Sequence, residues 1–563
     1  MPTLDEYKKM ADLLFPSIHK TPEDYYKMYP KRDLPEGTEV TRFAPSPTGY
    51  MHIGGVYQCL INRAVAKSSP CGIFYLRDED TDSKREVAGS ANIFVPSLKG
   101  FGIEFDEGFI SEGQEKGDYG PYIQSKRVEI YQAFAKDLVS RGLAYPCFCT
   151  EENEEAKEEQ LRLGLPLGYY GRWAKCRDLS LEEVENNLKA NKPFTIRIKS
   201  NGDGTKRFKF KDLRIGETML PVNSNDYIIL KSDGQTLYHL AHLVDDTLMH
   251  TTTVIRDESW FPSIPLHIQL FEYFNLPAPK YLHTPTVNTI DQETGNIRKV
   301  SKRKDNWADS RWFHEKGYPS SAIVDYLMNL INSNYEPWRN EHPNSSVLEF
   351  EFKISNMSKS GALFDIAKID NVSKNVISRM SGEEVYNRTL SWAEKYDSNV
   401  YGLLQKHAEY AKKVFGMDKN LARPRKDITT FSEVVPFYSY MFKELYSNDY
   451  LEYDYQKLSN DTMINALKHY LSVFDILDDK DKWFGKMKEV ATDCGFCPDM
   501  KEYKKNPEQF VGSVADFSTI IRVSLTGKRQ TPDLYEIIQL LGEDEVKLRL
   551  DNAINFLQEK CKK

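Results

Sequence analysis

Residues 42–55, R-F-A-P-S-P-T-G-Y-M-H-I-G-G, are the part of the chain that decides the fold. The residues just before Ala44 alternate like a short strand, and Ile53, Val56 and Leu60 then recur at helical spacing. Two prolines and a glycine lie between, and two more glycines follow, so the backbone turns there and can be approached closely. The stretch predicts a strand, turn and helix that bind a nucleotide phosphate at the helix N-terminus. A turn that only reverses the chain is the alternative.

This stretch resembles the first signature of the bacterial-type glutamyl-tRNA synthetases, which are class I aminoacyl-tRNA synthetases. The resemblance implies a Rossmann-type α/β catalytic domain with a parallel sheet. It also implies ATP contacts from Gly49, His52, Gly54 and Gly55. His52 stands at the mouth of the predicted helix, where it can donate a hydrogen bond to a phosphate oxygen as charge develops.

A second segment, K-V-S-K-R at residues 299–303, resembles the lysine-serine-lysine loop of the same family. Lysine suits this loop because a compact ammonium on a flexible stem can follow phosphate oxygens as pyrophosphate leaves. Alone, such a basic run is typical of a solvated loop. Its position after the first signature favours an ATP loop. The resemblance implies that His52 and Lys302 are catalytic, and that the ATP-binding residues of the loop are Lys299, Ser301, Lys302 and Arg303.

A rival for the ATP loop is N-M-S-K-S at residues 356–360, which is closer to the family consensus by letters. It precedes G-A-L-F-D at residues 361–365, which resembles the family's post-catalytic segment. Lys299 instead follows an apolar stretch at residues 281–287, as the loop should. We therefore predict that Lys302, and not Lys359, contacts ATP.

Charged residues at predicted strand ends fit a substrate with two carboxylates. Arg42 and Arg256 each end an apolar run, and each can bind a carboxylate bidentately. The resemblance implies that Arg42 binds the side-chain carboxylate of glutamate with help from Tyr238, and that Arg256 binds the α-carboxylate. It assigns the α-ammonium to Glu79 and adds Ser46 to the glutamate-binding set. Buried structural arginine pairs are the alternative.

The sequence predicts an α/β protein whose Rossmann-type catalytic domain carries an acceptor-end-binding insertion and precedes an all-helical anticodon-binding region. In the insertion we expect a charged helix at residues 151–162 and short strands near residues 194–198 and 207–210. The predicted domains are an N-terminal extension at 1–37, the catalytic domain at 38–275 with its insertion at about 145–237, a stem-contact region with the ATP loop at 276–371, and the helical region at 372–563.

The N-terminal extension has no counterpart in the two signatures. Tyr25, Tyr26, Tyr29 and Pro30 would suit packing onto the catalytic domain, and disorder before Asp33 is the alternative. Its first forty residues mix acids with lysines, unlike a transit peptide, and contain no signal-peptide core. A cytoplasmic protein is expected.

Composition bounds the partners. A chain of 563 residues can hold two to four domains, and no apolar run approaches a membrane span. The net charge of −8 does not exclude tRNA, because binding needs a local basic surface and not a basic total. The expected partners are tRNA(Glu), with tRNA(Gln) left open, L-glutamate and ATP with Mg²⁺, and the expected assembly is a monomer.

Eight cysteines in a chain of this size suggest reduced core residues or metal ligands rather than disulfides. Cys147, Cys149 and Cys176 resemble a zinc knuckle of some glutamyl synthetases, whose fourth ligand is a histidine two residues after the third cysteine. Asp178 stands at that place here, and a carboxylate can bind zinc. Both zinc and a set of core thiols therefore stay open. The pair at 494 and 497 is interpreted as incidental thiols.

We conclude that the chain resembles an enzyme that adenylates glutamate and transfers it to tRNA. A glutaminyl enzyme would show Glu in place of Ser46, histidine in place of Gly55 and a β-barrel anticodon region. A truncated paralogue that modifies a tRNA base would lack the last two hundred residues. A catalytically silent tRNA-binding paralogue remains the alternative, because a fold alone does not prove activity.

Overall fold

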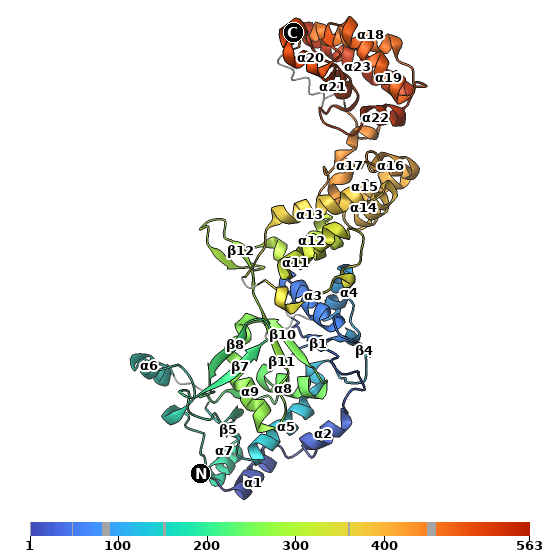
Figure 1. Cartoon of the computed structure of the whole chain (residues 1–563). Coiled ribbons are helices and arrows are strands. Elements are labelled where there is room, and N and C mark those ends of the chain that lie inside the picture. Colours follow the sequence, from blue (N-terminus) through green and yellow to red (C-terminus); the bar gives the residue numbers. More distant parts are fainter. Residues whose placement is uncertain are drawn as a thin grey trace. The chain divides into compact units, whose positions relative to one another are not determined.

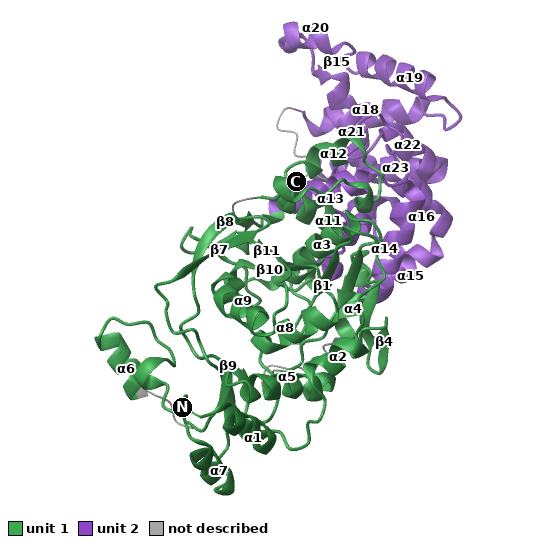
Figure 2. Ribbon diagram, turned by 60° about the horizontal axis from the view of Figure 1, so that its bottom comes forward, with its two compact units in different colours: residues 1–312, 323–366 green, residues 313–322, 367–563 purple. Residues whose placement is uncertain are grey.

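The computed structural model describes residues 2–47, 49–81, 91–149, 154–358, 361–447 and 458–562. The chain divides into two compact units, shown in two colours in Figure 2. Unit 1 holds residues 1–312 and 323–366, and unit 2 holds residues 313–322 and 367–563. Within the described ranges, no helix combines the length and the apolar character needed to cross a bilayer.

The predicted parallel sheet forms the centre of unit 1 (Figure 1). The N–H of Thr252 donates to the carbonyl of Val40 at 3.0 Å, which sets the second half of this sheet beside the first. The carboxyl ends of its parallel strands therefore meet at one edge, where doubly wound folds bind their ligands. The first half contains β1 (Val40–Phe43), β2 (Ile73–Leu76), β3 (Glu107–Ser111) and the antiparallel β4 (Gln114–Lys116); the second contains β10 (Thr253–Asp257) and β11 (Lys280–Thr284).

Helix α3 (Ile53–Lys67) follows the nucleotide turn as predicted. Its apolar residues Ile53, Val56 and Leu60 are buried where the helix packs on β1, β2 and β10. The strand, turn and helix expected from residues 42–55 are thus confirmed. The other helices of this domain are α4 (Ala91–Gly100), α5 (Val128–Ser140), α8 (Tyr238–Leu248) and α9 (Ile264–Tyr273).

The insertion forms its own antiparallel sheet and also extends the catalytic sheet. β5 (Ala144–Cys147), β6 (Thr195–Ile198) and β9 (Ile228–Leu230) make a three-stranded sheet. The hairpin of β7 (Arg207–Asp212) and β8 (Gly216–Pro221) instead joins β11, where Asp212 pairs with Tyr281. The expected charged helix is α6 (Glu154–Arg162), whose predicted start at 151–153 lies outside the described residues, and α7 (Leu181–Lys189) follows it.

The ATP-loop segment lies at the end of a hairpin. β12 (Val287–Ile290) and β13 (Ile297–Lys299) flank a turn at residues 291–296, and β14 (Ala362–Leu363) pairs in parallel with β12. Of the rejected rival, Lys359 and Ser360 lie outside the described residues. Three helices lie between β13 and β14 in the sequence: α10 (Arg311–Lys316), α11 (Ser320–Ile331) and α12 (Tyr335–Glu341).

In its described residues unit 2 is helical, as expected from residue 372 onward, apart from one two-residue parallel pair, β15 (Phe496–Cys497) with β16 (Gly512–Ser513). Several of its helices begin at a serine or aspartate whose side chain accepts a backbone N–H. Its helices are α13 (Ile366–Arg379), α14 (Gly382–Tyr396), α15 (Ser398–Lys406), α16 (Ala408–Phe415), α17 (Val434–Phe437), α18 (Asn460–Val473), α19 (Lys480–Asp493), α20 (Met500–Lys505), α21 (Val514–Thr526), α22 (Leu534–Leu541) and α23 (Glu543–Lys562).

The N-terminal extension packs on unit 1, which is one of the two alternatives left open by the sequence. α1 (Leu4–Leu14) and α2 (Pro22–Met28) each begin at a capping box. Tyr7, Met10 and Leu14 are buried in one core with residues of α5. The hydroxyl of Tyr29 donates to the carbonyl of Gly120 at 2.9 Å. The extension is therefore an integral part of the hydrophobic core.

Substitution Met10→Ala tests this packing. Met10 is 1% exposed, so truncation should leave a cavity and lower the free energy of unfolding by about 2–5 kcal/mol. The segment before residue 30 should also be cleaved faster by protease, and both can be measured on the full chain. The matched control is Lys9→Ala on the exposed side of the same helix, which should change neither. Equal denaturation midpoints for the two variants would refute the packing.

Candidate active site

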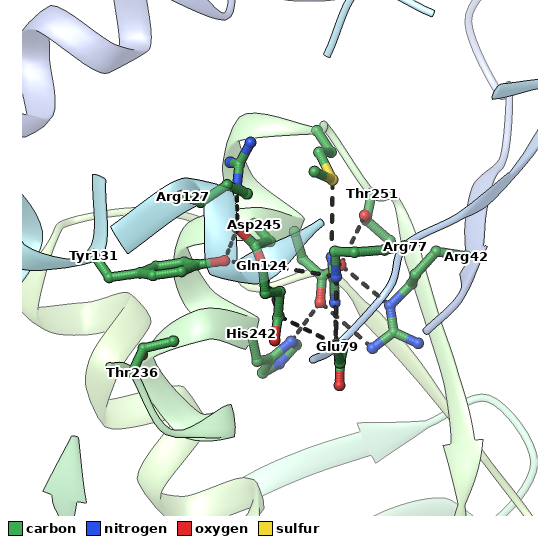
Figure 3. Close-up of polar contacts among 12 residues, drawn as sticks. Arg42, Arg77, Glu79, Gln124, Arg127, Tyr131, Thr236, His242, Asp245 and Thr251 are labelled. Atoms are coloured by element: carbon green, nitrogen blue, oxygen red, sulfur yellow. Dashed lines mark hydrogen bonds and ion pairs between the residues drawn. The ribbon is translucent and has the colours of Figure 1, made fainter. Parts of the chain in front are cut away.

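A buried aspartate of α8, Asp246, joins Arg42 and Arg77 at the carboxyl edge of the sheet, where Figure 3 labels the two arginines. Asp246 accepts from Nε of Arg42 at 3.1 Å and from Nη1 of Arg77 at 3.0 Å. His242 and Thr251 complete its shell at 2.5 and 2.9 Å. Burial alone would raise the pKa of Asp246, but Arg42 and Arg77 hold it well below its ordinary value. Asp246 is thus an ionised counter-ion inside the protein.

The preceding residue, Asp245, holds a third buried arginine. Its carboxylate accepts from Nε of Arg127 at 2.7 Å, and from Gln124 and Tyr131 at 2.9 Å each. Arg77 also donates to Oε1 of Glu79 at 2.9 Å. The cluster therefore contains three guanidinium groups and three carboxyl groups, namely those of Arg42, Arg77, Arg127, Asp245, Asp246 and Glu79.

Arg42 is already paired within the chain, which corrects the expectation of a free bidentate fork for substrate. Its Nε and Nη2 face the carboxylate of Asp246, and Nη1 donates to the carbonyl of Ile255 at 3.3 Å. A guanidinium has five N–H donors, so two remain, one on each terminal nitrogen. Arg42 is thus paired within the chain, its outer end can still meet a ligand, and its glutamate-binding role stays a prediction.

Glu79 lies beside the turn that follows β1, since its N–H donates to the carbonyl of Pro45 at 3.0 Å. Among the described residues, the hydrogen bonds to its side chain, from Arg77 and Gln124, all reach Oε1. Burial raises the pKa of this carboxyl group, and Arg77 and Arg42 offset that only in part. Ser46, on the same turn, is exposed. Ser46 thus lies on the loop of the nucleotide signature, and Glu79, which follows β2, lies beside that loop.

Arg256 differs from Arg42 in having only uncharged partners. Among the described residues, no carboxylate oxygen lies within 4.0 Å of its guanidinium. Its donors reach His283 at 3.0 Å, Tyr238 at 3.2 Å and His267 at 3.2 Å, and its side chain is nearly buried, at 6% exposure. The hydroxyl of Tyr238 therefore contacts Arg256. Its help to Arg42 in binding the side-chain carboxylate of glutamate stays a prediction.

His52 caps helix α3 with its side chain. Nδ1 accepts the N–H of Gly54 at 2.9 Å, which places the proton of the neutral ring on Nε2. Burial, together with Lys302 and Lys299, lowers the pKa of His52 to about 4, so the ring is neutral near pH 7. A Cβ at Gly54 would come within 3.0 Å of this ring. Nε2–H is left as a donor at the mouth of the helix.

The two signature segments are neighbours in space. The ammonium of Lys302 donates to the carbonyl of Tyr50, and the N–H of Ser310 donates to the carbonyl of Met51 at 3.0 Å. Arg298 bridges Asp291 and Asp305 at 2.7 Å each, which fixes the base of the loop. The remaining candidates of the loop are Lys299, whose ammonium lies 3.4 Å from Asp257, half-buried Ser301 and exposed Arg303.

The three candidate zinc ligands are also brought together. The sulfur atoms of Cys147, Cys149 and Cys176 lie within 4.8 Å of one another, and the hydroxyl of Tyr169 lies 3.5 and 3.4 Å from the first two. Hydrogen bonds from Cys176 and then Tyr169 lower the pKa of the Cys147 thiol, despite its burial. Asp178 is not part of this set, because its carboxylate lies 3.4 Å from Lys199 and is 54% exposed.

In unit 2 a pocket of about 530 Å³ gathers arginines and an aromatic ring. Phe484 is 40% exposed there, and Arg522 is held by the carbonyl of Pro532 at 2.7 Å. Arg425, Arg529 and Thr531 line the same pocket. Cations beside an accessible ring suit an unpaired nucleobase and its phosphate.

Sequence reasoning missed Asp245, Asp246, His242, His267 and His283. The cue for the first two was two consecutive acids in the mostly apolar residues 240–248. An acid on an apolar helix face must find a partner or cap, so a buried counter-ion could have been predicted there. Its identity could not, because Arg42 lies 204 positions away in the chain.

Comparisons with known proteins agree with this geometry. Residues 39–371 match the family described as tRNA synthetases class I (E and Q), catalytic domain, and residues 508–554 match one described as anticodon binding domain. The chain is 46% identical over 547 residues to a glutamate–tRNA ligase of Clostridium perfringens strain 13, across 97% of this chain and 100% of that protein. The corresponding Clostridium beijerinckii protein is 42% identical over 557 residues, across 98% and 100%.

A solved structure is similar over most of the chain. It is a glutamate tRNA ligase from Elizabethkingia meningosepticum in complex with its amino acid. The TM-score is 0.73 at 25% sequence identity, and the match covers 92% of this chain and 100% of that one. The likeness thus extends through the catalytic and the helical parts.

Stability at acid pH should depend on the buried imidazoles. Burial lowers the pKa of His239 and His242 to about 4, whereas the unfolded chain takes up a proton near about 6.5. The unfolded state therefore binds more protons in this window. The free energy of unfolding should be greatest above about pH 6.5 and fall as the pH drops toward about 4, as measured by chemical denaturation.

His242→Asn supplies the control for this prediction. Asparagine can keep a donor toward Asp246 but cannot titrate, so the variant should lose less stability between about pH 6.5 and 5 than the parent chain does. Carboxyl groups titrate mainly below that window and affect both proteins alike. Identical pH slopes for the two chains would contradict a neutral buried His242.

Proposed function

Because this chain belongs to the class I glutamate–tRNA ligases, we propose that the carboxyl-edge cluster of unit 1 is where it binds glutamate and ATP. The observation that carries the proposal is the charge of the site. The buried cluster around Asp245 and Asp246 is balanced, whereas Arg256 adds one positive charge that no carboxylate within 4.0 Å neutralises among the described residues.

Glutamate fits this charge, since its two carboxylates and one ammonium sum to −1. Glutamine sums to zero and would leave a buried guanidinium without a counter-ion. Well-built polar sites reject a ligand that leaves such a group unpaired by up to roughly 10⁴-fold. Glu79 would accept hydrogen bonds from the α-ammonium. Arg256 and the outer end of Arg42 would donate hydrogen bonds to the two carboxylates. Selection of glutamate then follows from charge as well as shape.

Activation requires in-line displacement at the α-phosphorus of ATP by a substrate carboxylate oxygen, with pyrophosphate leaving. Nε2–H of His52 would donate to a phosphate oxygen as its charge grows, and the ammonium of Lys302 would follow the departing pyrophosphate. Gly49, Gly54 and Gly55 would let the phosphates approach the backbone, with Lys299, Ser301 and Arg303 around them. Mg²⁺ accompanies ATP in this chemistry. A terminal ribose hydroxyl of tRNA would then attack the glutamyl carbonyl and release AMP.

The parts of the chain would divide the tRNA between them. The insertion at about 145–237 would bind the acceptor end, residues 276–371 the stem, and residues 372–563 the anticodon. The pocket of Phe484, Arg522 and Arg529 is our candidate for an anticodon base, and its choice of base would decide between tRNA(Glu) alone and tRNA(Gln) as well. We further propose a monomer that acts in the cytoplasm.

Zinc is the proposed occupant of the cysteine cluster. Three sulfur atoms within 4.8 Å suit a tetrahedral site, and the hydroxyl of Tyr169 lies where a fourth ligand would be needed. Cys147, Cys149 and Cys176 would thus stiffen the insertion beside β5.

Aminoacylation with Lys302→Ala tests the proposed reaction. Purified tRNA(Glu) and tRNA(Gln) are each offered labelled glutamate and labelled glutamine. We expect glutamate on tRNA(Glu), with kcat reduced at least ~100-fold in the variant, as for loss of a group that stabilises transition-state charge. Charging of both tRNAs would show a non-discriminating enzyme.

Lys304→Ala is the matched control, since this exposed lysine pairs with Asp291 at 3.5 Å. It should retain nearly the full rate. If the parent chain binds tRNA but charges neither, the silent paralogue is the correct function. If Lys302→Ala and Lys304→Ala lose equal activity, the assignment of Lys302 is wrong.

Metal analysis tests the zinc proposal. The purified chain should contain about one zinc per molecule, and Cys149→Ala should contain almost none. Cys71→Ser is the control, because Cys71 is exposed and distant in sequence from the cluster, and it should keep its zinc. A metal content that is the same in both variants would leave Cys147, Cys149 and Cys176 as core thiols.

A further inference from the structure

The environment of Arg256 is unusual for a buried cation. Its Nε donates to Nε2 of His283 at 3.0 Å, and its Nη2 lies 3.2 Å from Nδ1 of His267. Both imidazoles are fully buried, and Tyr238 supplies the third contact. Arg42 has a carboxylate in the equivalent place, at the end of β1. Arg256 is therefore oriented by hydrogen bonds without being neutralised.

The guanidinium fixes which nitrogen of each ring carries the proton. It has only donors, so Nε2 of His283 and Nδ1 of His267 must both accept. The proton of His283 then lies on Nδ1 and is donated to Oδ2 of Asp212 at 2.8 Å. The proton of His267 lies on Nε2 and is donated to Nδ1 of His239 at 3.0 Å. Each ring can play this part only while it is neutral.

Electrostatics keep both rings neutral. Burial is the largest cause that lowers the pKa of each, and the charge of Arg256 lowers it further. His267 also faces the rings of His239, His242 and His283, which lower its pKa further. Arg214 lowers the pKa of His283, and Asp212 raises it and so opposes the downward shift. A protonated ring would turn a donor toward the guanidinium and break the contact.

We propose that His283 and His267 are positioning residues that orient Arg256 without neutralising its charge, so that a substrate carboxylate becomes its counter-ion. This rests on the proposed glutamate site. An aspartate in place of either ring would orient the arginine equally well, but it would compete with substrate for the same charge. The neutral imidazoles therefore orient the guanidinium of Arg256 and leave its positive charge available to the substrate.

The insertion sets the tautomer of His283 through Asp212, the last residue of β7. Oδ2 of Asp212 accepts both the N–H and Nδ1–H of His283, while Oδ1 accepts the N–H groups of Arg214 and Ile215 at 2.9 Å each. All four contacts come from donors, and Asp212 is 1% exposed. The hairpin of β7 and β8 therefore contacts Arg256 indirectly, through the hydrogen bonds that join Asp212 to His283 and His283 to Arg256.

The test compares His283→Gln with His283→Leu in aminoacylation of tRNA(Glu). The amide oxygen of glutamine can accept from Arg256 where Nε2 did, whereas leucine fills similar space without an acceptor. We expect leucine to raise the KM for glutamate at least tenfold with the KM for ATP within about twofold, and glutamine to restore the KM for glutamate to within about threefold. Thermal denaturation verifies that both variants fold.

His267→Asn and His267→Leu repeat the comparison, with the amide oxygen of asparagine in place of Nδ1, and decide the matter if His283→Leu does not fold. The proposal is overturned if leucine leaves the KM for glutamate unchanged, if it raises the KM for ATP equally, or if the amide variants are no better than leucine. Charging of tRNA(Glu) by the parent chain in the same assay keeps this outcome separate from a failure of the proposed function.

Discussion

The buried contact of Asp246 with Arg42 and Arg77 is the constraint on which the rest of unit 1 depends. A carboxylate that is 2% exposed is costly to bury unless its lone pairs and charge are met, and here two arginines, a histidine and a threonine meet them. The arginines come from β1 and from the end of β2, and the aspartate from α8, which lies beyond the insertion. The cluster therefore fixes how the two halves of the sheet come together.

The two arginines of the site, Arg42 and Arg256, differ in whether a carboxylate of the chain neutralises them. Arg42 is neutralised by Asp246 within the chain, whereas Arg256 has no carboxylate oxygen within 4.0 Å among the described residues, and we propose that a substrate carboxylate is its counter-ion. Removing one partner of a buried ion pair leaves the other uncompensated and is costly, so neither half of the cluster can vary alone. The edge of the sheet is thereby held rigid without substrate, which lowers the ordering cost of binding it.

Local patterns in the sequence were sufficient for the strand, turn and helix around His52 and for the helical character of unit 2, but the hairpin that carries Lys299 was not predicted. Each depends on residues a few positions apart. The pairing of Arg42 with Asp246 was not predicted, because this contact joins residues 204 positions apart in the chain. Likewise, nothing in the alternation of residues 207–212 tells which sheet that strand will join. Burial and register follow from the whole fold, and periodicity reports only one element at a time.

The position of His52 requires a side chain that both caps helix α3 and donates a hydrogen bond outward, and few residue types can do both. Serine or aspartate would cap α3 as well, since capping requires only an acceptor for a backbone N–H. A second function requires a donor pointing outward from the same position, and neutral imidazole offers both on opposite sides of one ring. Capping by Nδ1 fixes the tautomer, and Lys302 and Lys299 help to keep the ring neutral. Helix α3 thus begins with the N–H groups of Gly54 and Gly55 already bonded to His52, and we propose that the Nε2–H of the same ring donates to a phosphate oxygen.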